Sequence, residues 1–166
     1  IGRMKNLSLK NIAKACNGKL YNCYGIENVL VSDVVIDSRK VTEGCLFIPI
    51  KGARVDGHDF IPQVLADGAV CVLSQYRLDT DKPYIQVLST TQALMDIAAF
   101  YRQSLDIKVI GITGSVGKTS TKETIASVLS QKYKVLKTLG NFNNEIGLPL
   151  TIFRLQDDDE VAVLEM

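Results

Sequence analysis

The feature that most constrains this chain is a glycine-rich loop between an apolar run and a helical segment. Residues 109–112 read Val-Ile-Gly-Ile, and the loop Thr-Gly-Ser-Val-Gly-Lys-Thr follows at residues 113–119. A continuous apolar run is expected of a central strand in a parallel sheet with both faces covered. A helix is expected over residues 118–132. A strand, a glycine-rich turn and a helix in this order form the setting that a phosphate-binding loop requires.

The residue types in this loop suit an anionic ligand. Gly114 and Gly117 let the backbone bend so that successive N–H groups point inward, where the helix dipole adds positive potential. We expect Lys118 to reach the β- and γ-phosphates of a nucleotide, and Thr119 to place its hydroxyl on Mg²⁺. The pattern departs from the common form, which has Gly five residues before Gly117, because Ile112 stands there. The alternative is a glycine-rich turn that binds nothing.

Two further segments are expected at the same end of the sheet, because open parallel sheets bind ligands beyond the carboxyl ends of their strands. Residues 140–149 carry three asparagines, whose amides supply donors and acceptors without charge. A turn that leads into a helix explains these residues equally well. Glu165 follows the apolar run 161–164 and is placed to hold Mg²⁺, although acidic strand ends without a function are common.

The rest of the chain predicts alternating strands and helices, and therefore an α/β fold class. Ser8 is expected to cap a first short helix, which Gly18 ends. Further strands are expected over residues 29–36, 45–50, 69–73 and 84–88, and helices over 60–65 and 90–105. After the loop, we expect strands over 134–138 and 161–164, a short helix over 150–155, and a helix over 118–132 with Ile125, Val128 and Leu129 facing inward.

This pattern predicts two domains, residues 1–106 and residues 107–166. The first has the size of a small α/β domain. The second is the start of a mostly parallel sheet with a phosphate-binding loop, and three strands are a poor stopping place for such a sheet. We therefore expect the chain to be the N-terminal part of a longer protein.

Composition excludes several classes of protein. The 166 residues are 46% hydrophobic and 22% charged, as in ordinary globular proteins, and the net charge of +1 argues against a general nucleic-acid or membrane-surface binder. No apolar run approaches the roughly 18 to 20 residues of a membrane span, and no signal-peptide pattern is present. The four cysteines form no metal-binding spacing and predict reduced thiols in a cytoplasmic protein.

Several motifs in matching order resemble the Mur ligases. TGSVGKTSTKE at 113–123, GNFNNEIGLPLT at 140–151 and VAVLEM at 161–166 are similar to the central domain of that family. The segment 34–60, VVIDSRKVTEGCLFIPIKGARVDGHDF, is similar to its N-terminal, UDP-recognising domain. The likeness runs over essentially the whole chain from about Leu7. It implies a three-domain cytoplasmic enzyme of peptidoglycan synthesis, with the N-terminal domain and the beginning of the ATPase domain in this chain.

The resemblance also implies a reaction. ATP would activate the terminal carboxylate of UDP-N-acetylmuramoyl-tripeptide as an acyl phosphate, with Mg²⁺ as the metal. The amine of D-alanyl-D-alanine would then attack through a tetrahedral intermediate, giving ADP, phosphate and the pentapeptide precursor. The implied enzyme is a monomer that inserts into no membrane and binds no nucleic acid, and this part of it alone is expected to be inactive.

Site residues follow from the motifs that match. The nucleotide-binding set implied by the resemblance is Gly114, Ser115, Val116, Gly117, Lys118, Thr119, Ser120, Asn141, Asn143 and Asn144. Lys118 is the implied catalytic residue, and Thr119 and Glu165 are the implied metal ligands. Ser38 and Arg39 match a segment near the uridine diphosphate. Asp56 and His58 match a motif at the substrate end, although a lone His in a glycine-rich loop is more often a turn residue than a catalyst.

Other functions stay open on these residues. The nearest is a Mur-type ligase that adds a single amino acid, or a polyglutamate-type synthetase, although the long segment before the loop argues against the latter. A phosphate-loop kinase or GTPase is a second class, and the guanine-reading Asn-Lys-x-Asp pattern is absent from the sequence. A non-catalytic nucleotide-binding module is the third.

Overall fold

The computed structural model describes residues 2–140 and 144–166, and it divides into two compact units, 1–97 and 98–166. Helix α3 (Thr90–Gln103) runs across the division. Both units combine helices with mostly parallel strands, which confirms the predicted α/β fold class. The predicted boundary after residue 106 between two functional domains stays a prediction. Within the described residues, no helix is both long enough and apolar enough to cross a bilayer.

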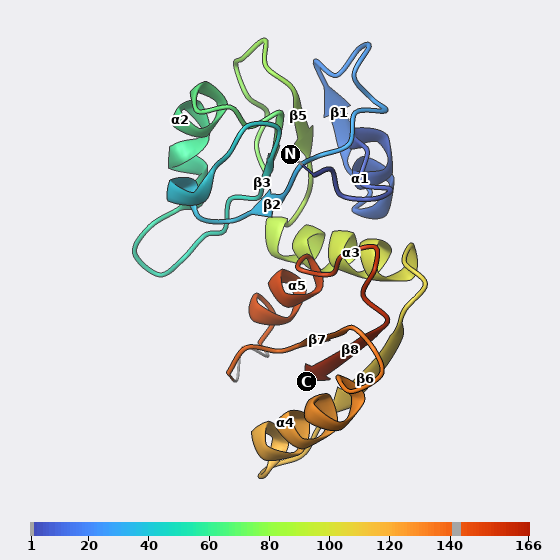
Figure 1. Ribbon diagram of the computed structural model, residues 1–166. Helices are drawn as coiled ribbons and strands as arrows, with labels where there is room; N and C mark the ends of the chain where they lie inside the picture. Colours follow the sequence, from blue (N-terminus) through green and yellow to red (C-terminus); the bar gives the residue numbers. More distant parts are fainter. Residues whose placement is uncertain (1, 141–143) are drawn as a thin grey trace. The chain divides into compact units, whose positions relative to one another are not determined.

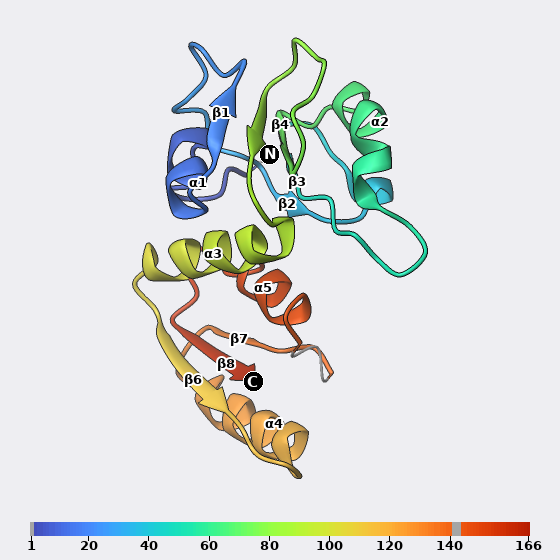
Figure 2. The same ribbon diagram turned by 180° about the vertical axis from the view of Figure 1, so that it is seen from behind.

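Unit 1 is built on a five-stranded sheet with the order β1-β5-β4-β3-β2. Figures 1 and 2 together label its strands. The strands β2 to β5 are parallel to their neighbours, and β1 pairs antiparallel with β5 at one edge. The strands are β1 (Lys19–Tyr21), β2 (Val34–Val35), β3 (Leu46–Phe47), β4 (Cys71–Ser74) and β5 (Tyr84–Gln86). Phe47, Val72 and Tyr84 from three of them meet Ile61 and Val64 of α2 (Ile61–Ala66) in one apolar core.

Helix α1 (Leu9–Ala15) begins as the sequence predicts, because the hydroxyl of Ser8 accepts a hydrogen bond from the Asn11 N–H at 3.1 Å. Two short 3₁₀ turns, η1 (Ser38–Lys40) and η2 (Gly57–Phe60), lie in the loops after β2 and β3. Each begins after an aspartate whose carboxylate accepts from a backbone N–H two residues later. Such Asp-started turns set the shape of both loops.

In unit 1, two predicted strands are much shorter than expected, and one observed strand was not predicted. The strand expected over 29–36 is reduced to β2, because the Val31 N–H donates to the Leu7 carbonyl, which pairs this segment with the N-terminal residues instead of the sheet. The strand expected over 45–50 ends at Phe47, shortly before Pro49, which has no N–H for a ladder. The three-residue edge strand β1 was missed, since so short a segment shows no alternation.

Unit 2 contains a three-stranded parallel sheet with the order β6-β8-β7. Its elements are β6 (Lys108–Ile112), α4 (Lys118–Leu129), β7 (Val135–Lys137), α5 (Gly147–Ile152) and β8 (Val161–Glu165). Figures 1 and 2 show α4 and α5 on opposite sides of this sheet. Ile112, Ala126, Val161 and Val163 form the core under α4.

Three predictions for unit 2 were wrong. The helix expected over 150–155 spans Gly147–Ile152 as α5, because Asn144 Oδ1 accepts from the backbone N–H groups of Ile146 and Gly147 and so starts the helix before Pro149. Among the described strands β6 lies at the edge and β8 at the centre, because both β6 and β7 pair with β8, whose five residues are all buried. Val128, expected to face inward, is 63% exposed. The inner face of α4 is instead formed by Ala126 and a lysine, Lys122, while Ile125 and Leu129 pack at the border of the core.

Candidate functional site

The phosphate loop has the predicted strand–loop–helix geometry. It connects the end of β6 at Ile112 with the start of α4 at Lys118. Gly114 and Gly117 have φ angles of +143° and +78°, which side-chain-bearing residues rarely adopt. Within the described part of the chain, no backbone N–H of residues 113–117 donates to another backbone group. The loop therefore presents its N–H groups at a helix N-terminus, where the dipole favours an anion.

Some side chains of the loop are exposed to solvent, and others bond to residues at the end of β8. Ser115, Val116 and Ser120 are exposed, and the Ser120 carbonyl accepts a hydrogen bond from the Thr124 hydroxyl at 3.0 Å. The Lys118 ammonium lies 3.3 Å from the carbonyl oxygen of Met166, the residue after β8. Lys118 is thus held over the carboxyl end of the central strand.

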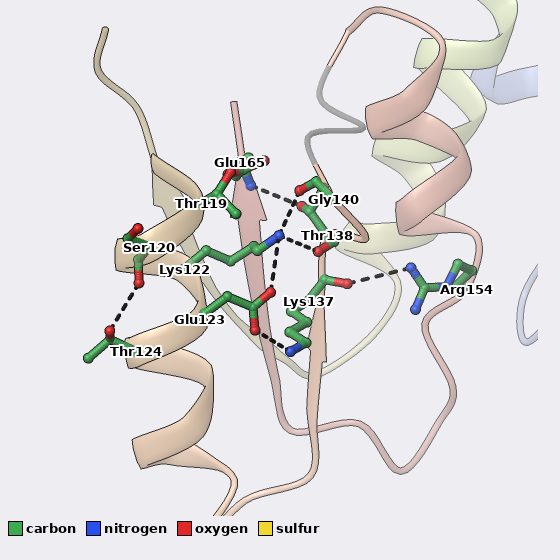
Figure 3. Close-up of polar contacts among 10 residues, drawn as sticks. All are labelled: Thr119, Ser120, Lys122, Glu123, Thr124, Lys137, Thr138, Gly140, Arg154 and Glu165. Carbon is green, nitrogen blue, oxygen red and sulfur yellow. Dashed lines mark hydrogen bonds and ion pairs between the residues drawn. The ribbon is translucent and has the colours of Figure 1, made fainter. Parts of the chain in front are cut away.

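Thr119 and Glu165 meet at that same end of the sheet. The Thr119 hydroxyl donates to Glu165 Oε1 at 2.7 Å (Figure 3). Glu165 is 1% exposed, and among the described residues its Oε2 atom has no hydrogen-bond partner. A buried carboxylate oxygen without a partner costs about 1–3 kcal/mol or more. A hydroxyl beside a carboxylate that has one oxygen without a partner is a donor set that fits a hard divalent cation such as Mg²⁺.

The asparagine-rich segment is described only in part. Asn141 and Asn143 lie outside the described residues. Asn144 Oδ1 accepts from the backbone N–H groups of Ile146 at 3.1 Å and Gly147 at 2.6 Å, so it caps the start of α5. The interpretation as a turn leading into a helix therefore holds for Asn144, and its contact with a nucleotide stays a prediction.

Ser38 and Arg39 lie in η1 of unit 1. The Arg39 guanidinium is 87% exposed and donates to both carboxylate oxygens of Asp37, at 3.0 Å through Nε and at 2.8 Å through a terminal nitrogen. These side-chain bonds, together with one from the Arg39 backbone N–H, lower the pKa of Asp37 to about 2. Asp37 thereby fixes the direction of an exposed cation next to the half-buried Ser38.

Asp56 and His58 form a connection between two loops of unit 1. Asp56 Oδ1 accepts from the His58 backbone N–H at 3.0 Å and contacts His58 Nδ1 at 2.7 Å. These bonds lower the pKa of Asp56. His58 Nε2 accepts from the Gln75 N–H at 3.0 Å, which assigns the proton to Nδ1. Both ring nitrogens are engaged within unit 1 and the side chain is 7% exposed, so His58 acts structurally here and its contact with a substrate stays a prediction.

Two family models match this chain. The model described as Mur ligase family, catalytic domain, matches residues 30–102, and the Mur ligase middle domain matches residues 112–166. The chain belongs to the Mur ligase family. The second match begins at the last residue of β6 and includes the phosphate loop, Thr119 and Glu165.

Relatives and solved structures agree with this assignment. The chain is 40% identical over 163 residues to the UDP-N-acetylmuramoyl-tripeptide–D-alanyl-D-alanine ligase of Escherichia coli K12, covering 98% of this chain and 35% of that protein. It is 44% identical over 162 residues to the enzyme of the same name from Bacillus subtilis 168, covering 96% and 35%. The chain thus spans about a third of the length of these curated relatives.

Among solved structures, a crystal structure of MurF from Acinetobacter baumannii superposes with a TM-score of 0.89 at 31% identity, covering 99% of this chain and 36% of that one. A MurF ligase from Thermotoga maritima, solved in complex with ADP, gives a TM-score of 0.74 at 39% identity, covering 81% and 31%.

Two residues that adjoin this candidate site were missed by sequence reasoning. Lys122 is completely buried on the inner face of α4, and its ammonium donates to the carbonyl oxygens of Thr138 and Gly140. The Thr138 hydroxyl in turn accepts from the backbone N–H of Glu165 at 3.0 Å. The available signal was a lysine at 122 in helical register with the inward Ala126 and Leu129, a position where an apolar residue is expected.

Proposed function

We propose that this chain is the N-terminal part of an ATP-dependent ligase that joins D-alanyl-D-alanine to UDP-N-acetylmuramoyl-tripeptide. Two observations of different kinds support the proposal. Relatives at 40% and 44% identity, aligned over nearly the whole chain, carry the name of that ligase. The observation in this chain that carries the nucleotide site is the buried, unpartnered Glu165 oxygen beside Thr119 at the phosphate loop.

We propose ATP as the nucleotide and Mg²⁺ as the metal. The exposed loop N–H groups and Lys118 would hold the phosphates, and Thr119 and Glu165 would hold Mg²⁺. When bound, Mg²⁺ neutralises negative charge on the phosphates. The Thermotoga maritima relative was solved in complex with ADP, which supports an adenine nucleotide as the ligand of this chain.

The reaction needs this concentration of positive charge. An anionic carboxylate must attack an anionic phosphate to form an acyl phosphate, and the two repel each other in the absence of screening. Lys118 lies at the carboxyl end of the central strand, where its charge would lower that repulsion. The positive φ angles of Gly114 and Gly117 let the loop bend around the phosphate chain, which would hold the phosphates in line for attack by the carboxylate.

The UDP end of the substrate is proposed to bind unit 1. The exposed Arg39 guanidinium, oriented by Asp37, carries a positive charge and keeps the N–H donors that do not bind Asp37, and both suit a diphosphate. Ser38 would add a hydroxyl at the start of the same turn. Asp56 and His58 would shape the loop through their contacts with each other and with Gln75.

Phosphate and ADP release by the full-length enzyme tests the proposal. With ATP, Mg²⁺ and UDP-N-acetylmuramoyl-tripeptide, we expect ADP release to require D-alanyl-D-alanine. Release with a single amino acid instead would assign a different Mur-type ligase. Release without any amine acceptor would indicate a kinase or simple ATPase, and absence of release with nucleotide binding preserved would indicate a binding module. A cytoplasmic location and a monomeric state stay predictions.

A further inference from the structure

Lys122 is a charged residue in a position that an apolar side chain would ordinarily fill. It is 0% exposed, and it shares the inner face of α4 with Ala126. Burial of an ammonium group is costly unless hydrogen bonds replace its water. The contacts of this lysine therefore indicate what it does.

The ammonium group makes two hydrogen bonds and one longer ion pair. It lies 2.8 Å from the Thr138 carbonyl oxygen, 2.7 Å from the Gly140 carbonyl oxygen and 3.5 Å from the Glu123 carboxylate (Figure 3). Two of these partners are backbone atoms in the segment just after β7. Lys122 thus fixes the position of that backbone relative to α4, the helix that starts at the phosphate loop.

Thr138 transmits this constraint to the proposed metal ligand. It is completely buried, its N–H donates to the Val163 carbonyl at 3.1 Å, and its hydroxyl accepts from the Glu165 N–H at 3.0 Å. Glu165 then meets the Thr119 hydroxyl at 2.7 Å. Three hydrogen bonds in sequence connect Lys122 with Thr119, which lies one helical turn earlier on α4.

We propose that Lys122 is a positioning residue of the nucleotide site, which holds Thr138 so that Thr138 holds Glu165 beside Thr119. The inference rests on the proposed Mg²⁺–nucleotide function. Lys122 is not expected to contact the nucleotide, because its ammonium group is buried and bonded to protein oxygens. Groups that orient metal ligands in this way commonly change metal affinity about 10- to 100-fold when they are removed.

The test measures ADP binding to the full-length enzyme by calorimetry, with Mg²⁺ and with a chelator. The ratio of the two affinities isolates the contribution of the metal. In Lys122→Met, which keeps the length of the side chain and removes the donors, we expect this ratio to fall about 10- to 100-fold. The matched control is Leu129→Ala, which weakens the same helix where it packs against the apolar core. There we expect the ratio to stay within about threefold of the native value, while thermal stability falls.

Equal ratios in Lys122→Met and Leu129→Ala, measured where both are folded, would overturn the inference and leave the proposed function intact. A native enzyme that binds ADP no better with Mg²⁺ would instead overturn both. If Lys122→Met does not fold, Thr138→Val decides, since it removes only the hydroxyl that holds Glu165. A lowered ratio in Thr138→Val, restored in Thr138→Ser, supports the inference, and a native ratio in Thr138→Val overturns it.

Discussion

The polar groups of the two units differ in how completely the protein satisfies them. In unit 1, Asp37 is bonded to Arg39, and Asp56 to His58, whose second nitrogen takes the Gln75 N–H. In unit 2, the buried Oε2 atom of Glu165 has no partner among the described residues. The first arrangement is complete without a ligand, whereas the second leaves a buried charge that a cation would satisfy.

This difference indicates how each unit contributes to binding. In unit 2, the loop and Glu165 are expected to contact the ligand directly, so substitutions should change chemistry and metal dependence. In unit 1, the paired residues hold the loops in shape. Substitutions there should mainly lower the free energy of unfolding or change the orientation of the exposed Arg39 guanidinium. Substitutions at the phosphate loop should therefore have the strongest effects, and substitution of the exposed Arg39 the weakest.

Lys118→Ala in the full-length enzyme is expected to lower ligation by about a thousandfold or more, because no other side chain of the loop supplies a charge for the phosphates. Binding of the UDP-substrate should stay close to native. Steady-state ADP release and equilibrium binding of the UDP-substrate measure the two effects. Unchanged turnover would refute the role of the loop and remove the contrast between the units.

Glu165→Gln is expected to lower ligation at fixed Mg²⁺ by about a hundredfold, because an amide replaces the charged oxygen offered to the cation. Part of the loss should return at high Mg²⁺ concentration. Activity measured over a range of Mg²⁺ concentrations reports this shift. The exposed Glu160, which precedes β8, provides a control, since Glu160→Gln should leave the Mg²⁺ dependence unchanged.

His58→Ala is expected to destabilise unit 1 by about 2–3 kcal/mol, because it removes a buried ring and leaves the Gln75 N–H without its acceptor. Denaturant unfolding measures this loss, and Mg²⁺-dependent ADP binding should stay native. Asp59→Ala, one residue along and exposed, should have little effect. Native stability combined with loss of UDP-substrate binding would instead assign His58 a direct contact.

Arg39→Ala is expected to weaken binding of the UDP-substrate about tenfold and to raise the pKa of Asp37 from about 2 toward its ordinary value. Because the folded-state pKa of Asp37 is lowered, its contribution to stability is present above the ordinary carboxyl pKa and is lost as pH falls toward 2. That contribution is small, since solvent screens the exposed pair. Carboxyl NMR titration gives the pKa. Lys40→Ala is the comparison variant, and it should raise the pKa of Asp37 less, because Lys40 acts on Asp37 only through the weaker charge attraction.

Local patterns predicted those elements whose signals lie within a few residues. Ser8 capped the first helix as expected, and the glycines at 114 and 117 marked the loop between β6 and α4. The order of the strands in unit 2 was not predictable in the same way. An apolar run indicates burial, but both β6 and β8 are apolar, so the sequence does not show which of them is central. The strand pairing in the structure places β8 at the centre.

The candidate site shows the same division. Thr119 and Glu165 are 46 residues apart and were expected to converge, because both follow from the rule that parallel strands end at one edge. Lys122 and Thr138 were missed, because a lysine in a helix is ordinarily solvated and a threonine after a strand has no distinctive pattern. Their importance arises from hydrogen bonds to backbone atoms, and the type of a residue does not indicate whether it makes such bonds.

The α/β class, the phosphate loop and the family could be predicted from the amino-acid sequence, because glycine positions, apolar periodicity and motif order can be read along the chain. The buried Glu165 oxygen without a partner among the described residues, and the connection from Lys122 through Thr138 to Glu165, became visible only in the folded structure. The reason is that burial and hydrogen-bond satisfaction depend on which distant segments pack together, and packing belongs to the whole fold.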